Sequence, residues 1–247
     1  SQKEATRELS LEGFRATLAA GLELHKAYPA NRIALRGKRG GRPRFPVPER
    51  YPDLRKYKST LDYQGKVAQS CMHCHMVQAA ERKMFRAAGK PIPDRVLYPW
   101  PMPDLVGLTL DPNTTATVSK VAAGSAAARA GFRSGDRIIS IDRQPIISIA
   151  DVQWVLHNAG DRDGFPVEVQ RDGRRSRLAL ALSAGWRRRG EISWRTTTWD
   201  LRRMATGGLL LEDLPAADRR RLRLKTDVLA LRVKHVGQFG AHAAAKR

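Results

Sequence analysis

The sequence is poor in cysteine, aromatic residues, acidic residues and long apolar runs. Two of its 247 residues are cysteines, which excludes a disulfide framework. No run approaches the ~18–20 apolar residues of a membrane span. Aromatic residues make up 6% of the chain and include no RNP-like motif, and zinc-finger spacing and a long basic arm are also missing. Apolar residues at 42% and charged residues at 28% are ordinary for a globular protein.

Basic residues exceed acidic ones by 45 to 24, which gives a formal net charge of +21. Short basic clusters are scattered over Arg36–Arg44, Arg171–Arg177, Arg187–Arg189 and Arg219–Lys225. This distribution favours a solvated, arginine-rich surface and disfavours nucleic acid as the partner. A weaker interpretation is docking to an acidic redox partner or to anionic lipid head groups.

The first half of the chain has helical periodicity. Leu9–Tyr28 predicts an amphipathic helix with Ser10 as N-cap, and Pro29 lies just beyond its end. We expect a loop over Arg36–Pro52, a second helix over Leu61–Ala88 and an extended, proline-rich connection over Lys90–Pro103. The apolar side of the first helix comprises Leu11, Phe14, Leu18, Leu22 and His25.

From Leu105 the pattern changes to short strands with turn signals between them. The predicted strands are Gly107–Asp111, Ala116–Val121, Arg137–Ile141, Pro166–Gln170 and Arg175–Leu182. Helices are predicted over Ser125–Ala130 and Ile149–Asn158. The fold class is therefore α+β, with a small barrel or sandwich carrying two helices after a helical segment.

The run Gly124–Ile147 resembles the bacterial PDZ signature, roughly GSPAxxAGhxxGDhIhxhxGxxh with h hydrophobic. Ala126 stands where that family often has proline, and Arg143 where it often has glycine. The resemblance covers about Leu105 to Ser183. It implies a module that adds the C-terminus of a protein or peptide as a strand to a sheet edge.

The resemblance also implies the walls of the groove. The turn that holds the peptide carboxylate would be Leu105–Leu108, and a helix would form the second wall. Trp154 is either a groove or a core residue, and each apolar wall residue has simple core packing as its alternative role. The predicted peptide-binding residues are Val106, Gly107, Leu108, Thr109, Leu110, Val152 and Leu156.

The tail repeats parts of this pattern. Gly208–Leu211 echoes Gly107–Leu110, and Val233–Val236 echoes Val118–Val121. Gly240–Arg247 similarly echoes the start of the PDZ signature. We interpret the tail as a partial second PDZ-like domain, with a C-terminal helical extension as the alternative.

Cys71, Cys74 and His75 form one C-x-x-C-H motif. Cysteines three apart share a helix face and can each bond a haem vinyl group, while the next histidine presents its imidazole to the iron. The motif resembles that of c-type cytochromes and predicts covalent haem c. Three alternatives remain open: a zinc half-site that uses His73 or His75, a thioredoxin-type redox pair, and two buried structural cysteines.

A sixth iron ligand is expected at Met102, whose proline-rich surroundings resemble the distal-methionine loop of small cytochromes c. The alternative for Met102 is core packing. The rival ligands are His25, His73, Met76 and Met84.

The stretch from Phe14 to Pro29 looks like the closing helix of a thioredoxin-like domain. The whole chain is thus similar to exported bacterial proteins that join such a region, a haem motif and HtrA-like PDZ repeats. The predicted domains are 1–35 (helical, the end of a thioredoxin-like domain), 36–60 (linker), 61–104 (haem segment), 105–183 (PDZ) and 184–247 (linker and partial PDZ).

These patterns predict a periplasmic or otherwise exported haem protein for electron transfer or redox sensing, whose PDZ domain recruits a partner. The sequence itself carries no signal peptide, so the export prediction assumes that the chain is processed or excised. The alternatives are a PDZ scaffold without haem, and a haem enzyme such as a peroxidase. We find no G-x-S-x-G or other hydrolase motif, so HtrA-like protease activity is not predicted.

Overall fold

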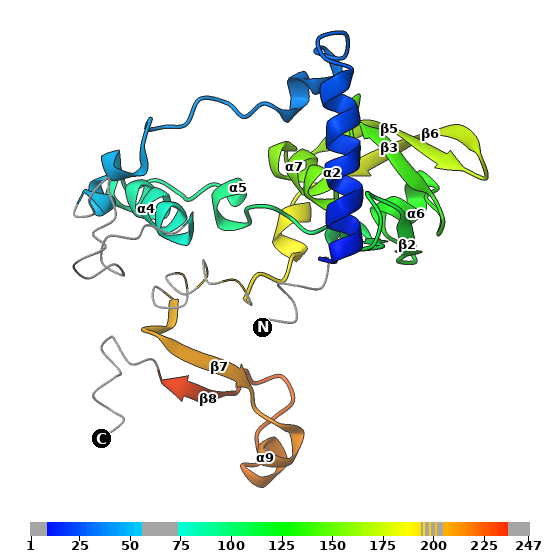
Figure 1. Ribbon diagram of the computed structural model, residues 1–247. Coiled ribbons are helices and arrows are strands. Elements are labelled where there is room, and N and C mark those ends of the chain that lie inside the picture. The colour runs from blue at the N-terminus through cyan, green and yellow to red at the C-terminus, as the bar shows by residue number, and fades with distance from the viewer. Residues whose placement is uncertain are drawn as a thin grey trace.

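The computed structural model describes residues 9–55, 74–193, 195, 198, 201 and 205–236 (Figure 1). None of the helices in these ranges is long and apolar enough to cross a membrane. The α-helices are α2 (Leu11–Lys26), α4 (Cys74–Ala87), α5 (Asp94–Leu97), α6 (Ala126–Ala130), α7 (Ile149–Asn158) and α9 (Ala216–Arg221). The 3₁₀ helices are η1 (Ala34–Lys38), η2 (Pro48–Arg50), η3 (Pro52–Leu54), η4 (Pro103–Val106) and η5 (Trp186–Arg189). The strands are β1 (Leu108–Leu110), β2 (Val118–Val121), β3 (Arg137–Ile141), β4 (Gln144–Pro145), β5 (Asp163–Arg171), β6 (Arg174–Leu182), β7 (Leu209–Asp213) and β8 (Leu231–Val236).

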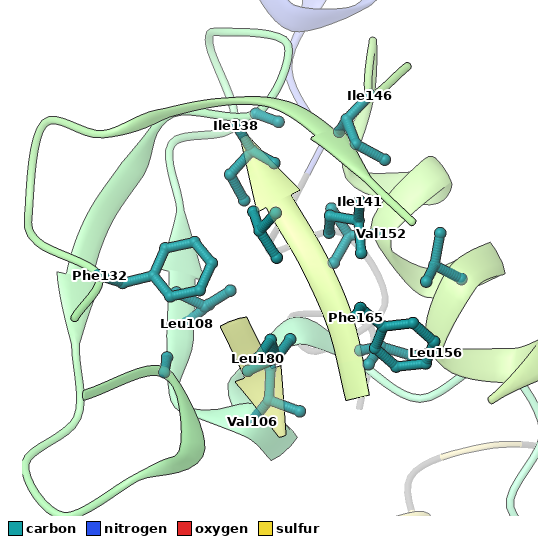
Figure 2. Packing of buried hydrophobic residues seen from close by; sticks show 14 of the residues in the cluster. Val106, Leu108, Phe132, Ile138, Ile141, Ile146, Val152, Leu156, Phe165 and Leu180 are labelled. Carbon is teal, nitrogen blue, oxygen red and sulfur yellow. The ribbon is translucent and has the colours of Figure 1, made fainter. Parts of the chain in front are cut away.

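The large core lies between η4 and η5 and contains two antiparallel sheets. One sheet has the order β4-β3-β5-β6, and the other pairs β1 with β2. A bridge between Thr117 and Arg137 joins the two sheets. Apolar side chains from both sheets, from α6 and α7 and from η4 and η5 meet in one cluster. Figure 2 shows part of it, including Val106, Leu108 and Leu156. The mixed helix-and-strand prediction for this region is therefore confirmed.

Two tight hairpin turns set the register of the four-stranded sheet. Asp142 and Arg143 both have positive φ and connect β3 to β4, and Asp172 and Gly173 connect β5 to β6 in the same way. Such pairs fit the twist of an antiparallel hairpin. Arg143 stands where the PDZ signature has glycine, so this left-handed backbone carries a side chain that disfavours it.

Asp136 holds β2 and β5 together from inside the domain. Its fully buried carboxylate receives two hydrogen bonds from Arg171, at 2.7 and 2.8 Å, and one from the backbone N–H of Arg133 at 2.9 Å. Burial raises the pKa of Asp136, but these bonds outweigh it and hold the pKa below its ordinary value. The backbone carbonyl of Asp136 also accepts the N–H of Val118, in β2.

Helix α2 lies against this domain with its small residues and turns its apolar side to solvent. Ser10 is its N-cap, as predicted, and Gly13 is its one buried residue. Leu11, Phe14 and Leu18 are all more than half exposed. Burying a leucine side chain contributes about 1.5–3 kcal/mol, so this helix gains little of the apolar stabilisation its sequence offers.

A second, small cluster lies around α4, where Tyr51, Leu54 and Ala80 are buried. The predicted helix over Leu61–Ala88 is described only from Cys74 onward, where α4 begins. The connection predicted as extended over Lys90–Pro103 contains the short helix α5. Pro93 stands at its N-cap, where a missing N–H costs nothing, and Asp94 lies in its first turn. The loop predicted over Arg36–Pro52 likewise contains 3₁₀ turns, of which η2 begins with proline.

The C-terminal hairpin pairs β7 with β8 in the same register as β1 with β2. Leu108 pairs with Val121 and Leu209 with Val236. A register shift follows the second residue of β1 and of β7 alike, between Thr109 and Leu110 and between Leu210 and Leu211. Gly107 and Gly208, the residues before each first strand, both have positive φ. Residues 237–247, which would extend the predicted repeat, lie outside the described residues.

Candidate peptide-binding site

The first part of the site is the turn between η4 and β1. The N–H of Gly107 donates to the carbonyl of Asp104 and so ends η4. Gly107 has a φ of 91°, and a Cβ at this position would lie 2.1 Å from the Cβ of Ser125. The carbonyl of Gly107 accepts the N–H of Ala122 at 2.9 Å, which fixes the turn against the end of β2. Only glycine fits here, because both the backbone angle and the close approach exclude a side chain.

The second part is the edge of β1. Among the strands in the described ranges, β1 pairs only with β2, so its other edge has no strand partner. Leu108 and Leu110 point into the core, while Thr109 is exposed. The hydroxyl of Ser119 donates to the carbonyl of Thr109 at 3.0 Å, across the paired edge. The strand is therefore fixed on one side and offers the other side for strand addition.

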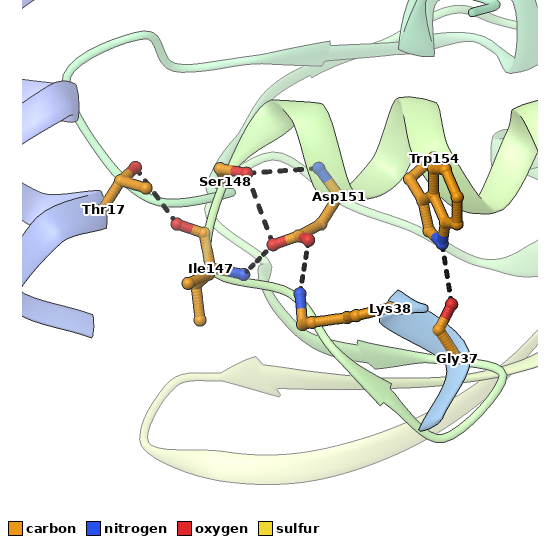
Figure 3. A network of polar contacts seen from close by, with 7 residues as sticks. All are labelled: Thr17, Gly37, Lys38, Ile147, Ser148, Asp151 and Trp154. Atoms are coloured by element: carbon orange, nitrogen blue, oxygen red, sulfur yellow. Dashed lines mark hydrogen bonds and ion pairs between the residues drawn. The ribbon is translucent and has the colours of Figure 1, made fainter. Parts of the chain in front are cut away.

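The third part is α7, whose bounds match the predicted helix. The hydroxyl of Ser148 caps it by accepting the N–H of Asp151 at 3.2 Å, and the Asp151 carboxylate accepts the N–H of Ile147 at 2.9 Å (Figure 3). Val152 and Leu156 face the core beneath the helix. This capping fixes the N-terminal end of α7 where it leaves the preceding loop.

The C-terminal end of α7 is held by a buried arginine. The Nη2 atom of Arg187 lies 2.9, 2.8 and 2.6 Å from the carbonyl oxygens of Leu156, His157 and Ala159. Burial lowers the pKa of Arg187. A cation at this end also complements the helix dipole. Because η5, which carries Arg187, contacts η4, the C-terminal end of α7 and the turn at Gly107 lie at the same end of the site.

His157 forms the outer side of that end. Trp100 stacks on its ring with centroids 4.3 Å apart, and the backbone N–H of Trp100 donates to its Nδ1 at 3.3 Å. Burial, followed by the positive charges of Arg187 and Arg95, lowers the pKa of His157 to about 4. His157 is therefore neutral near pH 7.

The structure brings the predicted peptide-binding residues together, and most of them are buried. The buried residues of both walls belong to one core cluster. A cavity of about 470 Å³ lies instead beside the turn, between residues 98–105 and 187–195. The exposed fractions are 2% for Val106, 0% for Leu108, 2% for Leu110, 1% for Val152 and 1% for Leu156.

Trp154 is neither in the groove nor in the core. Its indole Nε1 donates to the carbonyl of Gly37 at 2.7 Å (Figure 3). Its ring lies beside that of Trp100, with centroids 5.7 Å apart. In the same region Lys38 pairs with Asp151. The sequence analysis did not predict that residues 10–38 lie against the PDZ domain, with Gly37 and Lys38 in contact with α7. The signal was present in the spacing of Ser10, Gly13, Thr17 and Gly21, small residues on one side of the predicted helix.

Most of the C-x-x-C-H motif lies outside the described residues. Cys71 and His73 are among the residues left out, whereas Cys74 begins α4 and His75, half-buried, lies in its first turn. The described residues, which do not include Cys71 or His73, contain no cluster of three or more His, Cys, Asp or Glu side chains that could hold a metal.

The predicted sixth ligand, Met102, lies beside the PDZ helix. Its Sδ accepts a hydrogen bond from the Nε2 of Gln153 in α7 at 2.8 Å. Among the rival ligands, Met76 and Met84 pack on the small cluster around α4, and His25 is exposed.

Comparison with protein-family models supports the PDZ assignment. A family model described as "PDZ domain" matches residues 117–171. The chain is 37% identical over 75 residues to a probable periplasmic serine endoprotease DegP-like of Pseudomonas savastanoi pv. phaseolicola, covering 30% of this chain and 16% of that protein. It is 39% identical over 98 residues to the metalloprotease MmpA of Caulobacter vibrioides, covering 38% of this chain and 24% of that protein. Among solved structures, the HtrA3 PDZ domain bound to a phage-derived ligand is 20% identical with a TM-score of 0.25, covering 30% of this chain and 63% of that one.

The chain contains a PDZ domain with HtrA-like relatives. It spans a quarter or less of the length of the two curated relatives above. The family match includes Val152 and Leu156, but it begins after β1 and the turn at Gly107. The resemblance of the first helix to a thioredoxin-like domain stays a prediction.

Proposed function

We propose that this chain is a scaffold that binds the C-termini of proteins through its PDZ domain. The observation that carries the proposal is the combination of a glycine-only turn at Gly107, a β1 edge without a strand partner and the capped helix α7 beside them. A peptide carboxylate would lie at the turn, and the peptide backbone would pair with β1. This peptide-binding function does not depend on whether the chain carries haem.

The test compares acid and amide forms of one peptide. A phage library of heptapeptides with free C-termini is selected on the full chain, and the best peptide is synthesised in both forms. We expect the amide to bind at least about tenfold more weakly in fluorescence polarisation, because it loses a charge-assisted bond at the turn. Equal affinities for the two forms would contradict the proposal.

A pair of variants tests the turn itself. Gly107→Ala forces a side chain into Ser125 and should abolish binding, whereas Gly164→Ala, in β5, adds a methyl group to open space and should bind normally. Far-UV circular dichroism checks that both variants are folded. Equal peptide affinity in the two folded variants would place the binding site elsewhere.

We also propose, from its C-x-x-C-H motif, that the exported protein carries one covalent haem on Cys71, Cys74 and His75. The donor set fits this group, and α4 begins at Cys74, so that His75 lies in its first turn. When bound, the haem would supply one-electron redox chemistry for electron transfer or sensing, in contact with an acidic partner. Two relatives are described as probable periplasmic serine endoproteases, which supports export of this chain.

Mass spectrometry of protein exported in cells that mature c-type cytochromes tests this second proposal. We expect the polypeptide mass plus one haem, and the bare mass in Cys74→Ala. A bare mass for the unmodified sequence would contradict it. If Met102 is the sixth ligand, Met102→Ala should convert low-spin haem to high-spin haem, while Gln153→Ala, which frees the Sδ atom, should keep it low-spin.

A further inference from the structure

Helix α2 connects the two walls of the proposed groove. At one end of the helix the hydroxyl of Ser10 donates to the carbonyl of Pro112 at 2.7 Å. Two turns later the hydroxyl of Thr17 donates to the carbonyl of Ile147 at 3.2 Å (Figure 3). Pro112 lies just beyond β1, and Ile147 lies just before the N-cap of α7. Seven residues of helix rise about 10 Å, so α2 spans the opening between the two walls.

This opening is the end of the groove opposite to the turn at Gly107. The turn lies near the C-terminal end of α7, through the contacts of η5. A peptide with its carboxylate at the turn must therefore run along β1 toward Pro112. Because β1 is three residues long, it can pair with about the last three residues of the peptide. Peptide residues upstream of these three would meet α2, where the helix crosses in front of the domain (Figure 1).

A second set of contacts holds the same segment. We call residues 10–38 the strap. Lys38 pairs with Asp151 in the first turn of α7, and the carbonyl of Gly37 accepts the indole N–H of Trp154. The strap thus contacts α7 at its N-terminal end and along its outer side. Little apolar surface is buried in this contact, because the apolar side of α2 faces solvent.

We propose that the strap is an intramolecular gate on the peptide groove, so that a ligand longer than about three residues binds only when α2 is released. The inference rests on the proposed PDZ function and adds a selection by ligand length and a means of regulation. In this arrangement the apparent affinity is the intrinsic affinity multiplied by the fraction of molecules whose strap is released.

One helix offers a matched pair of variants to test the gate. A Cβ at Gly13 would lie 2.0 Å from the carbonyl oxygen of Pro112, whereas a Cβ at Gly21 would lie 3.9 Å from Ile147, an ordinary contact. Both Gly→Ala changes replace a residue of α2 by one with a higher helix propensity. Gly13→Ala should therefore displace α2 from Pro112 without unfolding the helix. Gly21→Ala is the control.

The probes are a heptapeptide selected on Gly13→Ala from a library with free C-termini, and a tripeptide of its last three residues. We expect the heptapeptide to bind Gly13→Ala about tenfold more tightly than the unchanged chain. This factor corresponds to an unchanged chain in which the strap is released in about a tenth of the molecules. Gly21→Ala should match the unchanged chain. The tripeptide, measured by NMR titration, should bind all three proteins within about twofold, because it ends before Pro112.

Hydrogen exchange tests the gate without a measurement of peptide affinity. Amides of α2 should exchange faster in Gly13→Ala, and also in the unchanged chain when the heptapeptide is added. Equal heptapeptide affinity in Gly13→Ala and Gly21→Ala would overturn the gate and leave the PDZ function intact. Failure of every selected peptide to bind any of the proteins would overturn both.

Discussion

The hairpins β1–β2 and β7–β8 share a register and a bulge, yet their surroundings differ. Leu108, Leu110 and Val118 are almost fully buried, because β3, β5, β6, α6 and α7 complete a core around them. In the second hairpin Leu231 and Val233 are nearly half exposed, and Leu229, just before β8, is 79% exposed. Strand pairing is thus set by the local sequence around each glycine turn, whereas burial depends on elements that follow later in the chain.

The largest expected effect comes from equivalent leucines in the two hairpins. Leu108→Ala should lower the free energy of unfolding of the PDZ domain by about 4 kcal/mol, because it leaves a cavity in a closed core. Leu209→Ala, at the same register position, should cost less than about 1 kcal/mol, since its side chain is only partly buried and no closed core surrounds it. Urea unfolding monitored by the fluorescence of buried Trp186 measures the first variant, and circular dichroism the second. Similar losses in both would mean that the second hairpin is also buried in solution.

The next effect concerns the polar anchor of the first hairpin. Asp136→Ala leaves Arg171 without its carboxylate inside the domain and should cost about 3 kcal/mol. The change should also bring hydrogen exchange in β2 closer to that of β8, because β2 loses its link to β5. Denaturant unfolding and exchange mass spectrometry together measure this. A loss well under 1 kcal/mol would show that the anchor contributes little.

Acid should lower the stability of the PDZ domain through His157. Its pKa in the folded protein is about 4, whereas an unfolded histidine titrates near 6.5, so the unfolded chain binds more protons between these values. The stability from this group is complete above pH 6.5 and is lost as the pH falls toward 4. Thermal unfolding between pH 7 and pH 4 should therefore show a smaller decrease of Tm in His157→Gln than in the unchanged chain. Parallel curves would assign the acid sensitivity to other groups.

The smallest expected effect is a stabilisation of the PDZ domain, which contains the β1–β2 hairpin. It should widen the difference in stability from the β7–β8 hairpin. Arg143 has a φ of 63° in the turn between β3 and β4, and glycine adopts this angle without strain. Arg143→Gly should raise the free energy of unfolding by about 0.5–1 kcal/mol, with β7–β8 unchanged. Chemical denaturation with Arg162→Gly as a surface control measures the gain.

Sequence reasoning gave the PDZ domain in some detail. Gly107 has positive φ in the turn predicted to hold the peptide carboxylate, and α7 has the predicted bounds. Strand β5 begins at Asp163, earlier than predicted, because Pro166 lies within the strand and its carbonyl accepts the N–H of Asp142. We expected Pro166 to be the first residue of the strand because proline has no backbone N–H to donate. It is tolerated within β5 because no N–H is required at this position.

The packing of α2 could not be predicted in the same way. Its periodicity identifies an apolar side of Leu11, Phe14, Leu18 and Leu22, and such a side is expected to be buried. The structure instead packs Gly13 and Thr17 on the domain, because the carbonyls of Pro112 and Ile147 accept short polar side chains at close approach. A pattern of hydrophobicity does not contain this information, since it depends on the shape of a partner far along the sequence.

The position of Arg187 has a practical consequence for isolating the domain. The family match ends at residue 171 and β6, the last strand of the four-stranded sheet, ends at Leu182, yet Trp186 fills the core and Arg187 binds three carbonyls at the end of α7. An excised domain that stops at the last strand would leave those carbonyls to water and open a hole beside Gly160, whose carbonyl accepts the Trp186 indole N–H. A stable fragment should therefore extend through Arg189.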